Sequence, residues 1–251
     1  MFSYCSCSCN GFLFLGKEKI MSTKLDELVK NINKEWKEDI AARGIHRLHT
    51  EKIPFTSPRL NYMTYGGLPR GRLIEFAGEE GGGKTTTALD ICKNAQELFQ
   101  KEYDEELSNT TDATRKKYLE SRGPKQIFYA DCENTLDEDW AAKLGVDVDN
   151  LYIVKPQTQS AEDIFQMVLD AIETDEVGLV VIDSLGVMLS KQAYEKDMTE
   201  KTYGGISMPL TLFSKKATLS CKKYDCTVIG INQLRDDMNS MYGGRTTTGG
   251  K

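Results

Sequence analysis

Short runs of consecutive apolar residues alternate along this chain with longer segments in which apolar residues recur every three or four positions. The runs predict buried strands at 73–77, 126–130, 151–154, 179–182 and 227–231. The periodic segments predict helices over 85–99, from Ser160 onward and over 209–224. Strands that alternate with helices predict an α/β fold with a mostly parallel central sheet flanked by helices.

A further helix is predicted ahead of this core, over 24–43. Its apolar positions form one stripe between charged residues, made of Leu25, Leu28, Val29, Ile32, Trp36 and Ile40. The stripe needs a surface to pack on. Its own domain and a neighbouring subunit are equally compatible with the pattern.

Residues 1–20 differ from the rest of the chain. Cys5, Cys7 and Cys9 alternate with serines and precede a short apolar run. A zinc site would need a second ligand cluster, and a secretory signal would need a basic residue before the apolar run. We therefore favour Met21 as the functional start, with 1–20 as a non-native or disordered leader.

Charge and polarity add little to this picture. The net charge of −6 gives no global basic field for nucleic acid, although a local basic groove is compatible with it. The polar stretch 101–125 predicts a solvated helical excursion or a flexible insert. No apolar run approaches the length of a membrane span, so we expect no membrane partner.

The strongest chemical signal is the segment 78–85, which reads G-x-x-x-x-G-K-T between a predicted strand and a predicted helix. This pattern is typical of the phosphate-binding loop of a nucleoside triphosphatase, because glycines let backbone N–H groups face the phosphates. We expect Lys84 to reach the β- and γ-phosphates and Thr85 to hold Mg²⁺. The predicted nucleotide contacts are Gly78, Glu79, Glu80, Gly81, Gly82, Gly83, Lys84, Thr85 and Thr86.

Two other predicted strands end in acids. Asp183 follows four apolar residues and is expected to complete the Mg²⁺ site with Thr85. Glu133 lies just beyond 126–130, where a carboxylate can orient the attacking water. An exposed strand-end acid without a catalytic role is the alternative for Glu133.

From Thr50 onward the chain resembles the RecA recombinase family. The resemblance is carried by 57–61, by Gly66-Gly67-Leu68-Pro69-Arg70-Gly71-Arg72-Leu73-Ile74-Glu75, by both nucleotide motifs, and by 131–147. It implies a P-loop NTPase with a RecA-like core, ATP as the nucleotide, and Glu133, Lys84 and Gln233 as catalytic residues. It also implies adenine contacts from Asp137 and Trp140, where the family usually has tyrosine at the second position.

The same resemblance implies two DNA-binding loops, 191–209 and 235–251. The residues expected to contact DNA are Tyr203, Gly204, Lys215, Arg235, Met238, Gly249 and Gly250. A surface lid explains the first loop equally well, and a solvated helix face explains Lys215.

We therefore expect an ATP-dependent DNA recombinase that forms a head-to-tail helical filament on single-stranded DNA and pairs it with homologous double-stranded DNA. The resemblance implies a cytoplasmic protein of bacterial or phage origin. We assign 21–50 to an N-terminal helical oligomerisation segment and 51–251 to the ATPase core. Because RecA chains continue past the second loop, we expect this core to be incomplete at its C-terminus. Another RecA-core ATPase, such as a helicase or repair motor, and a nucleotide-binding module without turnover are the alternatives.

Overall fold

The computed structural model describes residues 24–37, 50–195, 205–236 and 245–247, without the side chains of 235 and 236. The chain divides into two units, 1–49 and 50–251. In the first unit, α1 (Lys24–Trp36) is shorter than the predicted 24–43, and none of its residues is buried. The leader 1–20 and residues 38–43 of that predicted helix lie outside the described residues.

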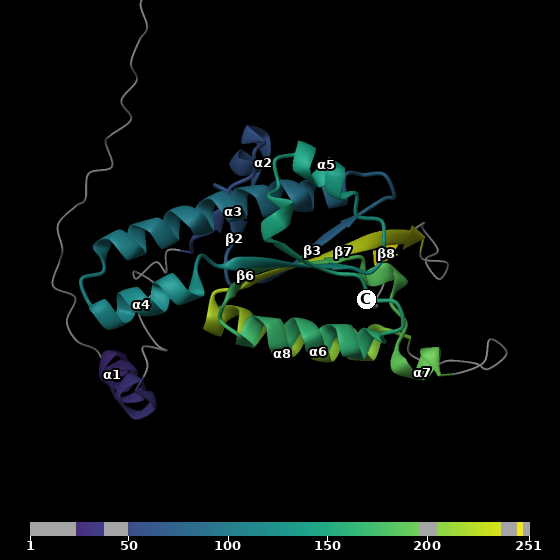
Figure 1. The fold of residues 1–251 in the computed structure, drawn as a ribbon. Coiled ribbons are helices and arrows are strands. Elements are labelled where there is room, and N and C mark those ends of the chain that lie inside the picture. The colour runs from purple at the N-terminus through teal and green to yellow at the C-terminus, as the bar shows by residue number, and fades with distance from the viewer. Residues whose placement is uncertain (1–23, 38–49, 196–204, 237–244, 248–251) are drawn as a thin grey trace, which may run out of the picture. The chain divides into compact units, whose positions relative to one another are not determined.

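A parallel sheet organises the second unit (Figure 1). Its strand order is β3–β7–β6–β4–β5, and β8 pairs antiparallel with β7. The strands are β3 (Leu73–Gly78), β4 (Gln126–Asp131), β5 (Leu151–Val154), β6 (Val177–Asp183), β7 (Thr227–Asp236) and β8 (Arg245–Thr247). This arrangement is the predicted mostly parallel α/β sheet.

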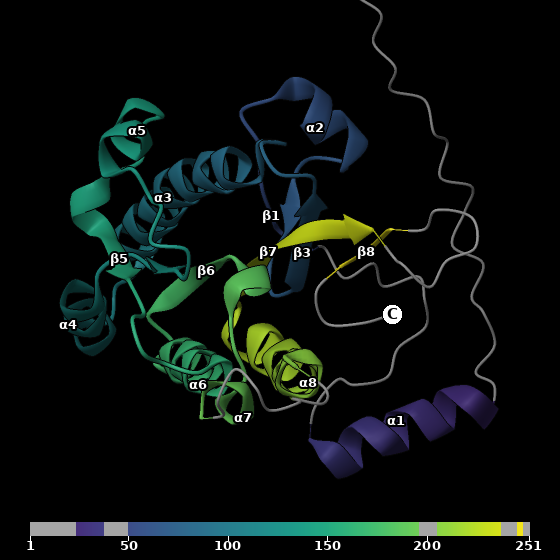
Figure 2. The same cartoon turned by 90° about the vertical axis from the view of Figure 1, so that its right-hand side faces the viewer.

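Helices cover both faces of the sheet (Figures 1 and 2). One face carries α3 (Lys84–Asn109) and α5 (Glu138–Lys143), and the other carries α6 (Ala161–Glu173) and α8 (Ser207–Tyr224). α4 (Ala113–Arg122) packs against α3. The shorter elements are α2 (Pro58–Met63), α7 (Lys191–Tyr194), η1 (Val148–Asn150), η2 (Leu185–Val187) and the antiparallel pair β1 (Lys52–Ile53) and β2 (Leu68–Pro69).

The core is built on β6, in which every residue is buried. Leu179 and Val181 pack into the cluster beneath α3, whereas Val180 and Ile182 pack into the cluster beneath α6 and α8. A strand covered on both faces is apolar at successive positions rather than alternating, which explains the uninterrupted run in the sequence.

The start of α6 follows the sequence prediction at atomic detail. The Ser160 side chain accepts a hydrogen bond from the N–H of Asp163, and the Asp163 carboxylate accepts one from the N–H of Ser160 at 3.0 Å. This reciprocal capping box satisfies two backbone donors that the first turn of a helix leaves unpaired.

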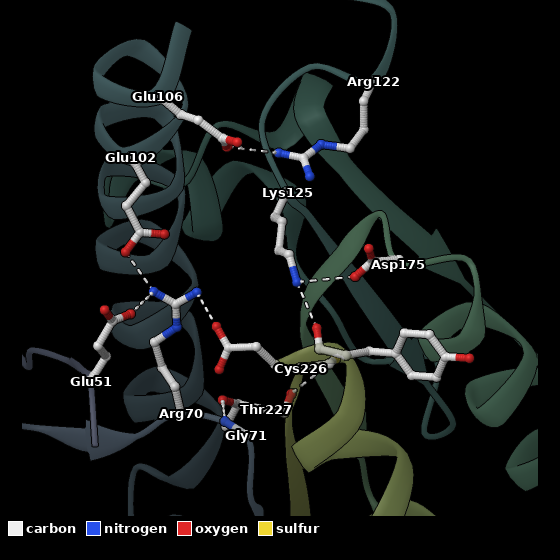
Figure 3. Close-up of polar contacts among 12 residues, drawn as sticks. Glu51, Arg70, Gly71, Glu102, Glu106, Arg122, Lys125, Asp175, Cys226 and Thr227 are labelled. Carbon is white, nitrogen blue, oxygen red and sulfur yellow. Dashed lines mark hydrogen bonds and ion pairs between the residues drawn. The ribbon is translucent and has the colours of Figure 1, made fainter. Parts of the chain in front are cut away.

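A buried arginine joins three segments at the amino ends of the strands, away from the phosphate loop (Figure 3). The Arg70 guanidinium is 5% exposed and forms ion pairs with Glu51, Glu102 and Asp225. It also lies over the Phe99 ring, with 5.4 Å between the guanidinium carbon and the ring centroid. These contacts connect the segment before β1, the last third of α3 and the turn between α8 and β7.

Several predicted boundaries were wrong. The helix expected to end at 99 continues to Asn109. The polar stretch 101–125 therefore contains the last nine residues of α3 and the whole of α4, which is the helical one of its two predicted forms. The loop expected over 191–209 contains α7 and the first residues of α8, and the loop expected over 235–251 contains β8. Within the described residues, no helix is both long enough and apolar enough to cross a membrane.

Candidate nucleotide-binding site

The carboxyl ends of four neighbouring strands bring the predicted site residues to one edge of the sheet. Strand register sets Gly78 of β3 beside Gln233 of β7, and Asp131 of β4 beside Asp183 of β6. In parallel α/β sheets this edge is where ligands bind. Segments far apart in the sequence therefore meet because β7 and β6 lie between β3 and β4.

The phosphate loop is held in shape by its glycines and its lysine. Gly81 and Gly83 have φ values of 71° and 78°, in the left-handed region that glycine adopts without strain. Lys84 donates hydrogen bonds from Nζ to the carbonyl oxygens of Gly78 (3.1 Å) and Glu79 (2.7 Å). The 26-residue α3 starts at Lys84, so its positive N-terminal end meets the loop. The side chains of Glu79, Glu80 and Thr86 are exposed.

Thr85 and Asp183 meet although they come from α3 and β6. The Thr85 hydroxyl donates to Asp183 Oδ2 at 2.8 Å, and the Tyr129 hydroxyl donates to the same oxygen at 2.8 Å. Burial raises the pKa of Asp183, and the two hydroxyl hydrogen bonds partly oppose that rise. Hydroxyl and carboxylate oxygens are ligands that Mg²⁺ prefers, so this pair fits the predicted metal site.

Glu133 lies on the turn that follows β4. The Ser184 hydroxyl donates to Glu133 Oε1, and the backbone N–H of Glu133 donates to the Asp183 carbonyl oxygen at 3.2 Å. Asp131 accepts hydrogen bonds from the N–H groups of Thr135 and Leu136, at 3.1 and 3.0 Å, and so shapes the same turn. The half-buried Glu133 carboxylate is therefore oriented from β6.

Gln233 is half-buried beside the start of the phosphate loop. Its neighbour Asn232 donates through Nδ2 to Glu75 Oε1 at 2.8 Å, which joins the side chains of β7 and β3. The catalytic role of Gln233 stays a prediction.

Asp137 and Trp140 lie at the start of α5. The Asp137 carboxylate caps this helix by accepting a hydrogen bond from the N–H of Trp140 at 2.9 Å. The Trp140 side chain is 47% exposed and offers a ring face to a planar ligand. The adenine contacts predicted for both residues stay predictions, and capping is a second role for Asp137.

Of the residues expected to bind DNA, Lys215 lies on α8 with an exposed side chain. The backbone of Arg235 continues β7. Tyr203, Gly204, Met238, Gly249, Gly250 and the side chain of Arg235 lie outside the described part of the chain.

Three contacts at this site were missed by the sequence analysis. Tyr129 belongs to a predicted strand, and a strand's two-residue period would have placed it on the same face as Ile127 and therefore toward α3. Ser184 directly follows the predicted metal ligand Asp183, and this position was the sequence signal that could have indicated a site residue. The ion pair of Glu79 with Arg245 joins residues far apart in the sequence, so no local sequence pattern predicts it.

Comparison with known proteins identifies the family of this chain. The family model for the RecA N-terminal domain matches residues 103–251, which is more than half of the chain. Protein RecA of Nostoc punctiforme is 32% identical over 94% of this chain and 58% of its own length. Protein RecA of Clostridioides difficile is 34% identical over 74% of this chain and 46% of its own length. The chain thus spans about half of the curated relatives that it matches.

A solved structure shares the fold. The RadB recombinase superposes with a TM-score of 0.51 at 18% identity, over 75% of this chain and 74% of that protein. At this identity the likeness concerns the fold alone. The RecA-like arrangement of the sheet and its helices is therefore common to both proteins.

Proposed function

Because this chain belongs to the RecA family, we propose that it is an ATP-dependent DNA recombinase that forms a head-to-tail helical filament on single-stranded DNA and pairs it with homologous double-stranded DNA. The observation that carries the proposal is the hydrogen bond between Thr85 and Asp183. It joins the phosphate loop to the strand-end acid, as a site for ATP with Mg²⁺ requires.

In this proposal the chain's own groups bind and orient the nucleotide. The N–H groups of 78–85 and the ammonium of Lys84 bind the phosphates, which requires Lys84 to exchange the carbonyl oxygens of Gly78 and Glu79 for phosphate oxygens. Thr85 and Asp183 would hold Mg²⁺, which would neutralise phosphate charge when bound.

Glu133 is the proposed general base. Ser184 donates to Oε1 and fixes the carboxylate, and we assign the attacking water to Oε2. The water proton passes to Glu133 as the water oxygen bonds to the terminal phosphorus. The bond from that phosphorus to the bridging oxygen breaks, and ADP leaves with the electron pair. We assign to Gln233, which pairs with Gly78 in the sheet, contact with the terminal phosphate and the link from it to the segment that follows β7.

The contacts with DNA and with other subunits rest on the family. We assign DNA binding to Lys215 on the exposed side of α8 and to the segments 191–209 and 235–251. The exposed apolar residues Leu25, Leu28 and Trp36 of α1 suit packing on a neighbouring subunit. Contacts between unlike surfaces produce a helical filament when the rotation does not close.

The test is ATP hydrolysis with and without single-stranded DNA, in the wild type and in two variants. We expect DNA to stimulate hydrolysis, Lys84→Ala to abolish nucleotide binding, and Glu133→Gln to bind ATP but hydrolyse it roughly 10²- to 10⁴-fold more slowly. ATP binding without DNA-stimulated hydrolysis would contradict the recombinase proposal and favour a nucleotide-binding module. Joint-molecule formation between a circular single strand and a homologous duplex then tests strand exchange.

A further inference from the structure

An ion pair connects the phosphate loop to the hairpin strand β8. Arg245, the first residue of β8, contacts Glu79 Oε1 through Nη1. Glu79 directly follows the last residue of β3, and β8 is held by antiparallel pairing of Arg245, Thr246 and Thr247 with the end of β7. β8 lies beside the tip of β7 (Figures 1 and 2), so the position of Arg245 depends on that pairing.

The phosphate loop is acidic for a site that binds a polyanion. Its eight residues contain two carboxylates, Glu79 and Glu80, and one ammonium, that of Lys84. A carboxylate next to bound phosphates repels them, and the repulsion is strongest at low ionic strength. Arg245 supplies a positive charge directly on one of the two carboxylates.

We propose that Arg245 is a positioning residue for the nucleotide, acting by neutralising Glu79. Arg245 reduces the repulsion between Glu79 and the phosphates of a bound triphosphate without itself touching the phosphates. Nucleotide affinity then depends on β8 staying paired with β7. This inference rests on the proposed ATP site and adds to it a residue outside the nucleotide motifs.

The exposure of the Arg245–Glu79 ion pair favours a role in nucleotide binding over a role in folding stability. The Arg245 and Glu79 side chains are 55% and 65% exposed. Ion pairs this exposed contribute little to folding stability, because water already solvates both charges. Removing the cation nevertheless leaves the negative charge of Glu79 uncompensated on the loop. This charge repels a triphosphate, so we expect nucleotide affinity to fall more than folding stability.

The experiment is a double-mutant cycle read out by the affinity for a fluorescent, slowly hydrolysed ATP analogue with Mg²⁺. We expect Arg245→Gln to weaken binding about three- to tenfold at low salt and less at high salt. In a Glu79→Gln background, Arg245→Gln should change affinity less than about twofold. Glu79→Gln alone should bind the analogue at least as tightly as the wild type.

Glu80→Gln is the matched control, because it removes an equal charge from the neighbouring position of the same loop. Arg245→Gln should keep its full effect in that background, since Glu79 is still present. Unchanged melting temperatures for the five variants, three single and two double, would separate the effect from a folding defect.

Two results would overturn the inference. If Arg245→Gln weakens binding equally with and without Glu79, Arg245 acts on the nucleotide directly. If it weakens binding in neither background, the pair has no part in binding. Failure of the proposed site looks different, because the wild type would then bind no better than Lys84→Ala.

Discussion

Asp183 holds a negative charge in a place where burial opposes it. The residue is 4% exposed, and burial raises its pKa above the ordinary value even though Thr85 and Tyr129 both donate to Oδ2. A raised pKa in the folded state means that ionisation at neutral pH destabilises the fold. Such a charge is retained at functional sites, where a cation would complete its surroundings.

Replacing Asp183 with asparagine should therefore separate stability from function. We expect Asp183→Asn to melt at the same or a higher temperature than the wild type without nucleotide, because the buried charge is gone and an oxygen acceptor remains. We also expect Mg²⁺ to lose its effect on nucleotide affinity. Thermal melts and titrations with and without Mg²⁺ measure both, and a large drop in melting temperature would contradict the argument.

At the scale of elements, the Arg70 cluster ties the β1–β2 pair to α3 and to the turn before β7 (Figure 3). The guanidinium is almost fully buried, whereas Glu51, Glu102 and Asp225 are 64%, 40% and 50% exposed. The three carboxylates would be hydrated again if the cation were removed. Their mutual repulsion and the space left over Phe99 would remain as a loss to the fold.

We expect Arg70→Met to lower the free energy of unfolding by about 2–4 kcal/mol. The urea midpoint should fall while its m value stays constant. Arg115→Met is the matched control, because Arg115 also pairs with an α3 carboxylate, Glu106 at 2.6 Å, but on the surface. The control should hardly move the midpoint, and equal effects of the two substitutions would contradict the importance of burial.

At the scale of the whole molecule, four cysteines of the described residues make folding stability depend on pH in the same direction. Burial raises the pKa of Cys92 and Cys132 to about 12 and that of Cys221 to about 11, and it also raises the pKa of Cys226. Thiols in the unfolded chain lose their protons near 9.0, so above that pH the unfolded state binds fewer protons than the folded state. Stability must then fall as pH rises.

Urea midpoints measured at several pH values between 7.5 and 10 check this. We expect a constant midpoint at the lower values and a steady decrease above about pH 9. Cys221→Ala should show a shallower decrease than the wild type, because one raised pKa is missing. A midpoint that is flat or rises up to pH 10 would contradict the burial of these thiols.

The sequence predicted what depends on neighbouring residues, and it missed what depends on distant ones. The phosphate loop, Asp183 at the end of β6 and the capping box of α6 are local patterns, and the structure has them. For 101–125 the sequence left a helical excursion and a flexible insert open, and the structure has the helical one, in which Glu102 and Glu106 pair with arginines outside α3. β8 was missed because its three residues become a strand only by pairing with β7.

The length of α3 has a mechanical consequence. The helix is about 39 Å long at 1.5 Å per residue. Lys84 at its start belongs to the phosphate loop, and Glu102, about 27 Å farther along, is fixed to Arg70. A stiff rod that is fixed at its start, at Glu102 and along its buried side resists tilting. Any movement produced by exchange of the nucleotide must therefore be taken up by the loop before α3 and by the hairpin that carries Arg245, and not by the helix.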